Sequence, residues 1–224
     1  MTTSLYSARE RSKQQIFYNP TWVALEWNFI PPEMIAEVCG IRYSNDQLAL
    51  SHDKFPTQEQ IKKCHEQGLS LMPGPPEPMS DLEVRDLSSS NLLSSKQIWY
   101  GDNKFAHTDK VGPGWIAYQR EPAAGSLGKS WLEYNWPLGA VPFEEPNAAE
   151  RLWIFLINKA VRGEYLFQRI CVRTSSLLDK NGDKDRDRMA FGYYAPDDIR
   201  AVAYSDTDAY PDLGSAGIWK FRSA

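Results

Sequence analysis

The sequence lacks any long apolar segment. No apolar run approaches the ~20 residues that a membrane-spanning helix needs. Residues 1–15, MTTSLYSARERSKQQ, have no apolar core of the kind found in signal peptides. We therefore expect a protein that is made in the cytoplasm and is not inserted into a membrane. Later association with a virion or a cell surface stays open.

Cysteine and excess positive charge are also scarce. Cys39, Cys64 and Cys171 are far apart and odd in number, which predicts reduced, buried thiols and no disulfide framework. The net charge is −4, so no basic field indicates nucleic acid or an anionic membrane as the partner. With 224 residues, 42% of them hydrophobic, the chain is long enough to bury a sizeable core.

Local signatures of catalysis are absent as well. The sequence contains no H-E-x-x-H, G-x-S-x-G or paired-carboxylate pattern. The stretch GSLGKS, residues 125–130, lacks the spacing of a phosphate-binding loop. Cys64 and His65 are adjacent on an expected helix and point to different sides, so they do not share a metal easily. We expect no enzyme, no metal and no cofactor.

One acidic stretch, residues 179–187, has alternating oxygen side chains like a calcium loop. An EF-hand loop needs Gly at its sixth position and Glu at its twelfth. Counting from Asp179 places Lys184 and Ala190 there, and basic residues alternate with the acidic ones. The pattern favours a solvated hairpin, with bound calcium as the open alternative.

Helix-capping patterns give the clearest local predictions. They predict helices over 31–40 and 57–68, a short helix that begins after Ser80, and a buried helix over 147–163. In the last of these, Asn147 caps the start, Glu150 completes a capping box and Gly163 ends the helix.

Strands are expected over 16–30, 164–176 and 188–195, and short strands joined by loops over 97–143. This order of elements predicts an α+β fold. We interpret the proline-rich stretch 71–78 as the main boundary, with 1–78 as an accessory region of unknown role and 79–224 as the main domain.

The stretch from residue 193 to residue 212 has an unusual composition. It holds four Tyr, five Asp and four Ala, and no Lys or Glu. Tyr supplies large contact area at low entropy cost, and Asp and Ser supply adaptable hydrogen bonds, as in antibody paratopes. Lys and Glu are depleted at interfaces. The composition therefore favours a binding surface, with an ordinary polar loop region as the alternative.

An ordered series of motifs surrounds this stretch. Asn147-Ala148-Ala149-Glu150 is followed by Arg173-Thr174-Ser175-Ser176, then by Leu213-Gly214, and finally by Lys220-Phe221. The series resembles the variable proteins of diversity-generating retroelements, over roughly residues 79–224. These proteins have a C-type lectin fold in its formylglycine-generating-enzyme-like form. The resemblance implies a C-type lectin-like α+β fold with a variable region at about 190–212.

The resemblance also implies a function. In that family a reverse transcriptase copies a template with errors at adenines, and the copy replaces the 3′ end of the gene. The result is a hypervariable surface for a protein or cell-surface ligand, held by fixed positions. Here these are Gly192, Ile199, Leu213 and Gly214, and the expected ligand contacts are Tyr193, Ala195, Pro196, Asp197, Arg200, Val202, Ala203, Ser205, Thr207, Asp208, Tyr210 and Asp212. Trp153, Phe155 and Trp219 are expected to be buried scaffold.

Two other functions stay open. One is an enzyme or calcium-dependent module of the related formylglycine-generating kind, using Cys171 or the acidic hairpin. The other is a structural subunit of a virion or envelope. The sequence identifies neither the ligand nor the oligomeric state.

Overall fold

The computed structural model describes residues 28–48, 55–87, 99–134, 141–179, 186–195 and 198–221; for 193–195 and 198 only the backbone is described. The strand expected over 16–30 lies almost wholly outside these ranges. Within them, no helix combines the length and the apolar character that crossing a membrane requires.

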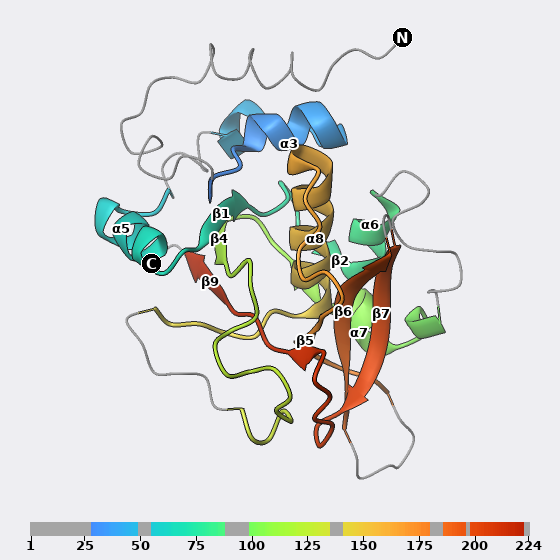
Figure 1. Cartoon of the computed structure of the whole chain (residues 1–224). Coiled ribbons are helices and arrows are strands. Elements are labelled where there is room, and N and C mark those ends of the chain that lie inside the picture. The colour runs from blue at the N-terminus through green and yellow to red at the C-terminus, as the bar shows by residue number, and fades with distance from the viewer. Residues whose placement is uncertain are drawn as a thin grey trace.

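The described elements form a mixed α+β structure with curled sheets, which confirms the α+β prediction (Figure 1). The helices are α3 (Pro32–Cys39), α5 (Gln58–Glu66), α6 (Asp81–Asp86), α7 (Lys104–Thr108) and α8 (Ala148–Arg162). The strands are β1 (Ser70–Pro73), β2 (Met79–Ser80), β3 (Lys110–Val111), β4 (Trp115–Tyr118), β5 (Cys171–Leu177), β6 (Asp187–Ala195), β7 (Asp198–Ser205), β8 (Leu213–Gly214) and β9 (Ile218–Phe221).

Helix α8 forms because its ends carry strong local signals. The Asn147 side chain accepts a hydrogen bond from the Glu150 amide at 2.9 Å, and the Glu150 carboxylate accepts one from the Asn147 amide at 2.9 Å. Gly163 ends the helix in the left-handed conformation, with φ of 70°. Residues 148–158 are all buried. The prediction of a capped, buried helix is confirmed.

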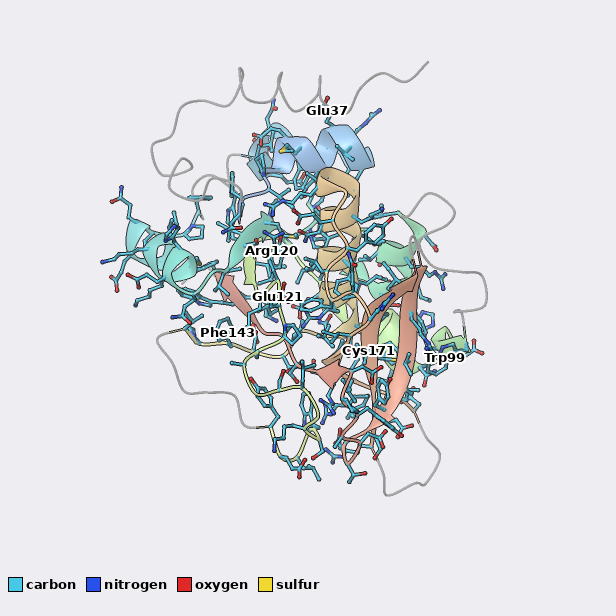
Figure 2. All side chains as sticks on the ribbon, viewed as in Figure 1. Glu37, Trp99, Arg120, Glu121, Phe143 and Cys171 are labelled. Atoms are coloured by element: carbon cyan, nitrogen blue, oxygen red, sulfur yellow. The ribbon has the colours of Figure 1, made fainter. Side chains whose placement is uncertain are left out.

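The other predicted helices are confirmed too. Capping boxes begin α5 at Thr57 and α6 at Ser80. Helix α3 begins at adjacent prolines and ends at Gly40, whose φ is 69°. On α3, Ile35 points into the core, whereas Glu37 points outward (Figure 2).

The described strands form three small sheets. One is antiparallel, in the order β1-β4-β9, and a second is the antiparallel pair β2-β3. The third has the order β7-β6-β5-β8, antiparallel except for the parallel pair of β5 with β8. Helix α8 lies between the first and third sheets (Figure 1).

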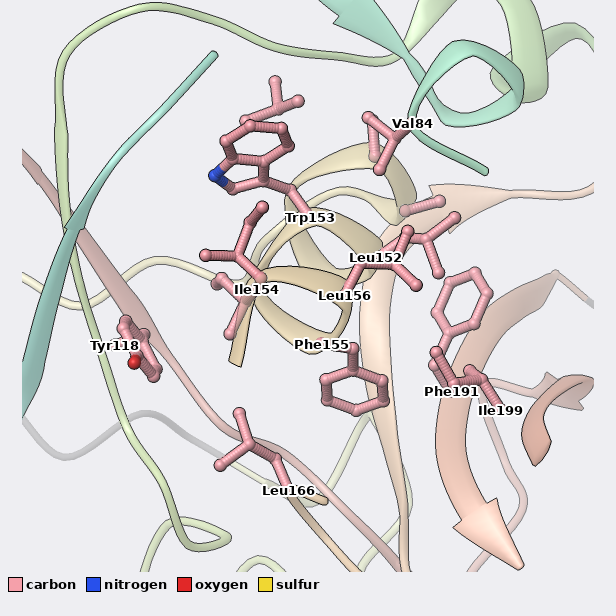
Figure 3. Packing of buried hydrophobic residues seen from close by; sticks show 14 of the residues in the cluster. Val84, Tyr118, Leu152, Trp153, Ile154, Phe155, Leu156, Leu166, Phe191 and Ile199 are labelled. Carbon is pink, nitrogen blue, oxygen red and sulfur yellow. The ribbon is translucent and has the colours of Figure 1, made fainter. Parts of the chain in front are cut away.

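The core surrounds α8 on several sides. Its Trp153 and Phe155 are fully buried, in one cluster with Tyr118 of β4 and with Phe191 and Ile199 of β6 and β7 (Figure 3). Burying an aromatic or aliphatic side chain of this size contributes about 1.5–3 kcal/mol. This cluster and the pairing of β6 with β5 attach the β6–β7 hairpin to the rest of the protein.

The stretch 71–78 differs from the expected linker. Leu71 and Met72 are fully buried, and residues 70–73 form strand β1 against β4. The Trp153 indole donates to the Pro73 carbonyl at 3.0 Å. Residues on both sides of the expected boundary thus share one core, because Ile35 and Met72 belong to the same cluster as Trp153. The division at residue 78 stays a prediction.

Three further expectations need correction. The strand expected over 164–176 begins only at Cys171, because Phe167 and Arg169 have positive φ values that break an extended chain. The stretch 97–143 contains the short helix α7 besides strands. Trp219 is half-buried: it lies at the edge of a core cluster that includes the buried Phe221, and its ring packs against that of Phe221.

Candidate binding surface

The candidate surface is built on the β6–β7 hairpin and the segment that follows it. Because side chains alternate along a strand, β7 has two kinds of residue. Ile199 and Ala201 face α8 and join the core, whereas Arg200, Val202 and Tyr204 lie on the other face. Strand β7 pairs with β6 in one uninterrupted register, from Asp187 opposite Ser205 to Tyr193 opposite Ile199.

The twelve expected contact residues fall into four groups. Pro196 and Asp197 lie outside the described residues, and Tyr193 and Ala195 are described only as backbone of β6. The exposed ones are Arg200, Thr207 and Tyr210. The half-buried ones are Val202, Ala203, Ser205, Asp208 and Asp212.

Two of the half-buried expected contacts also stabilise the local structure. Val202 packs, with Tyr204, against the buried Cys171, Ala190 and Leu213. The Asp208 carboxylate accepts a hydrogen bond from the Ser205 amide at 2.8 Å. These side chains shape the surface from below, and the exposed ones remain for contact.

Main-chain hydrogen bonds fix the segment 206–213. The Cys171 amide donates to the Asp212 carbonyl at 2.8 Å, and the Leu213 amide donates to the Tyr210 carbonyl at 3.0 Å. The Asp206 amide donates to the Arg186 carbonyl at 2.9 Å. None of these three bonds uses a side chain, so they remain available when side chains in this segment change. The Asp208 carboxylate and the Ser205 hydroxyl add side-chain bonds to the Ser205 and Thr207 amides.

The four expected fixed positions are all buried scaffold. Ile199 and Leu213 are fully buried. A Cβ on Gly192 would lie 2.1 Å from the Ile170 carbonyl oxygen, and one on Gly214 would meet the Leu127 side chain at 3.0 Å. Only glycine fits at position 192, because the neighbouring atom is backbone and cannot rotate away.

A cation–π contact joins the hairpin to a second segment, residues 126–132. The Arg188 guanidinium pairs with the Asp206 carboxylate at 2.6 Å and lies 3.7 Å from the centre of the Trp131 ring. Both members of the pair are mostly buried, and Asp206 is not among the expected contacts. Arg188 thus links β6 to the residue after β7 at the end of the hairpin opposite its turn.

The second segment was missed by sequence reasoning. Leu132 is 68% exposed and Leu127 is 44% exposed. Segment 126–132 runs beside 206–213, because the Gly128 amide donates to the Leu213 carbonyl at 3.2 Å. Its glycines indicated a loop, and no local signal showed which residues it would contact.

The four sequence motifs meet in space. The Ser176 hydroxyl accepts a hydrogen bond from the Ala148 amide at 2.7 Å, which ties β5 to the start of α8. The Lys220 ammonium lies 2.8 Å from the Glu150 carboxylate, where burial raises the Glu150 pKa and Lys220 counteracts that rise. Strand β8, Leu213–Gly214, pairs with β5.

Neither alternative site, Cys171 or the acidic stretch, has the features of a catalytic or metal site among the described residues. The Cys171 thiol is fully buried at the start of β5, which leaves no access for a substrate (Figure 2). Of the acidic stretch, 180–185 lie outside the described residues, and the Asp179 carboxylate accepts a hydrogen bond from the Lys104 amide at the start of α7. Within the described ranges, no three His, Cys, Asp or Glu side chains gather in a way that would hold a metal ion.

Comparison with protein-family models, with curated proteins and with solved structures found no match to this chain.

Proposed function

We propose that this protein is a non-enzymatic, hypervariable ligand-binding protein with a C-type lectin-like fold. Its surface is built from β7 and the segment that follows it. One observation carries the proposal: the backbone of 206–213 is held by main-chain bonds, while Arg200, Thr207 and Tyr210 point to solvent. A surface built this way tolerates many side chains on one backbone.

The chemistry of the exposed residues supports binding of a protein or cell-surface ligand. Tyr210 is 50% exposed, and its ring packs against the Tyr204 ring with 5.5 Å between the ring centres, a contact that restricts its conformations. A rigid aromatic side chain loses little conformational entropy on binding. Arg200 and Thr207, which precede it in the sequence, add polar groups.

The contacts among the motifs support the resemblance that suggests this fold. Residues from four distant parts of the sequence, including Ser176 and Lys220, meet around the start of α8 and the β5–β8 pair. A shared packing arrangement gives a physical reason for such residues to occur together in order. The C-type lectin-like fold and the retroelement origin are part of the proposal.

The experiment that tests the function is deep sequencing of the 3′ end of the gene, with its flanking DNA, across a population that carries it. We expect substitutions to cluster at the codons for exposed residues such as Arg200, Thr207 and Tyr210. We also expect a nearby near-copy with adenines at those positions. Codons for Ile199, Leu213 and Gly214 should be constant.

An invariant 3′ end with no second copy would overturn the proposal. A cluster of substitutions that spared exposed positions and struck the buried ones would also overturn it, because such changes would unfold the scaffold.

A further inference from the structure

Two surface segments lie side by side with weak direct pairing. The Gly128 amide donates to the Leu213 carbonyl at 3.2 Å, and the Leu132 amide donates to the Asp206 carbonyl at 3.4 Å. Both distances exceed the usual 2.9–3.0 Å of such bonds, so the pairing alone holds segment 126–132 loosely against segment 206–213.

A buried arginine connects the same two segments from below. Nη2 of Arg173, on β5, donates to the Lys129 carbonyl at 2.7 Å and to the Asp208 carbonyl at 2.7 Å. Only 1% of Arg173 is exposed. Hydrogen bonds from a charged donor are roughly twice as strong as neutral ones. The bridge through Arg173 is therefore stronger than the direct pairing above it.

The environment of Arg173 favours this fixed role. Burial lowers the pKa of its guanidinium, and the Glu145 carboxylate acts most strongly among the neighbouring charges to raise it again. Glu145 acts in the same direction on the buried Arg151, whose guanidinium donates to the Ala216 carbonyl. One carboxylate thus supports two buried arginines that both donate hydrogen bonds to backbone carbonyls.

We propose that the binding surface is composite and that Arg173 is its positioning residue. Residues 205–212 form a variable half, and residues 126–132 form a constant half that presents Leu127 and Leu132 to every ligand. Arg173 sets one half against the other. Because its hydrogen bonds go to the backbone carbonyls of residues 129 and 208, both bonds can form with any side chain at these positions. Ligand binding at this surface rests on the proposed function, whereas the positioning by Arg173 does not.

Hydrogen exchange of the full chain tests the positioning without any ligand. In Arg173→Lys, a single ammonium replaces the planar guanidinium, whose geometry matches two carbonyls at once. We expect the amides of Gly128, Leu132 and Leu213 to exchange about tenfold faster or more, together, while the amide of Leu152 in α8 keeps its rate. Arg120→Lys is the control: Arg120 is a half-buried arginine that pairs with Glu164, away from this surface.

The outcomes separate positioning from general destabilisation. Faster exchange in α8 as well, or equal effects in the Arg120 control, would reduce Arg173 to an ordinary core residue and overturn the proposal. Unchanged exchange in both segments, or a change in only one of them, would also overturn it, because a bridge must release both halves.

A measurement on the wild type covers the case in which Arg173→Lys fails to fold. At low denaturant, the Gly128 and Leu213 amides should open in one event, with protection factors that agree within about threefold. A difference of about tenfold or more would contradict a joined surface. Neither result depends on gene diversification, so failure here and failure of the sequencing experiment are distinguishable.

Discussion

The two faces of strand β7 differ although their residues alternate along one chain. On the inner face, Ile199 and Ala201 are buried against α8, together with Phe191 of β6. On the outer face, Arg200 is exposed and Val202 is half-buried. The same eight-residue strand therefore serves as core on one side and as a display platform on the other.

The difference shows how a protein can combine a fixed fold with a changeable surface. The inner face depends on the size and shape of each side chain, because packing leaves no free volume. The segment after β7 depends on backbone groups, such as the Asp212 and Tyr210 carbonyls, that every residue type supplies. Substitutions on the inner face and in that segment should therefore have very different costs.

The largest effect should come from Gly192→Ala. The added Cβ would lie 2.1 Å from the Ile170 carbonyl oxygen, and neither atom can move away by side-chain rotation because the backbone fixes both positions. We expect a loss of about 4 kcal/mol or more in the free energy of unfolding. Urea unfolding followed by tryptophan fluorescence measures it.

Gly112→Ala is the matched control, because a Cβ on Gly112 would meet no atom within 4 Å. Its free energy of unfolding should change by less than about 0.5 kcal/mol. Equal stability of the two variants would contradict the close approach of β6 to residue 170.

The second effect compares neighbours on β7. Ile199→Ala empties space in the core beside Phe191 and should cost about 3 kcal/mol. Arg200→Ala, one residue along on the opposite face, should cost less than about 0.5 kcal/mol. Thermal unfolding of both variants tests the contrast, and similar losses would mean that both faces of β7 are structural.

The core face could be predicted in large part from the sequence. The caps of α8 are local, since Asn147, Glu150 and Gly163 each act within a few residues of a helix end. Trp153 and Phe155 follow from the apolar density of that helix, and the buried fixed position Ile199 followed from the family resemblance.

The outer surface could be predicted only in part. Composition marked residues 193–212, yet it did not indicate that Leu132 would lie beside them, since the contact joins residues far apart in the sequence. The late start of β5, at Cys171 and not at residue 164, also could not be predicted from the sequence. Phe167 is apolar, as strand residues often are, but it adopts a φ of 54°. The bridging role of Arg173 depends on two loops that only the folded chain brings together.

The third effect concerns an ionisable group on the core side. Asp81, at the start of α6, is fully buried, and burial raises its pKa from 3.8 to about 7; the nearby Tyr100 hydroxyl and Arg85 act against that rise, and Asp109 adds to it. The folded-state pKa is thus above the unfolded value. The protonated form contributes stability that is complete below the unfolded pKa and is lost as the pH rises through about 7.

Asp81→Asn should remove this dependence. We expect the variant to gain about 2 kcal/mol relative to wild type between about pH 5 and about pH 8, measured by urea unfolding at each pH. Asp86→Asn, on the same helix but with a carboxylate that is 71% exposed, is the control and should follow the wild-type curve. If wild type and Asp81→Asn showed the same change of stability over this interval, Asp81 would be ionised in the folded protein throughout.

The smallest effect is expected where the proposed surface is most exposed. Tyr210→Ser removes a ring that is 50% exposed and has a tilted contact with Tyr204, so it should cost less than about 1 kcal/mol of the free energy of unfolding. Thr207→Ala, on an exposed side chain that contacts only the Ser205 hydroxyl among the described hydrogen bonds, should cost still less. The double variant should lose no more than the sum, because the backbone of 206–213 keeps its own bonds. Urea unfolding of the three variants measures this, with hydrogen exchange at Leu213 as the local check. A loss of about 2 kcal/mol or faster exchange at Leu213 would mean that these side chains hold the segment, which a freely variable surface does not permit.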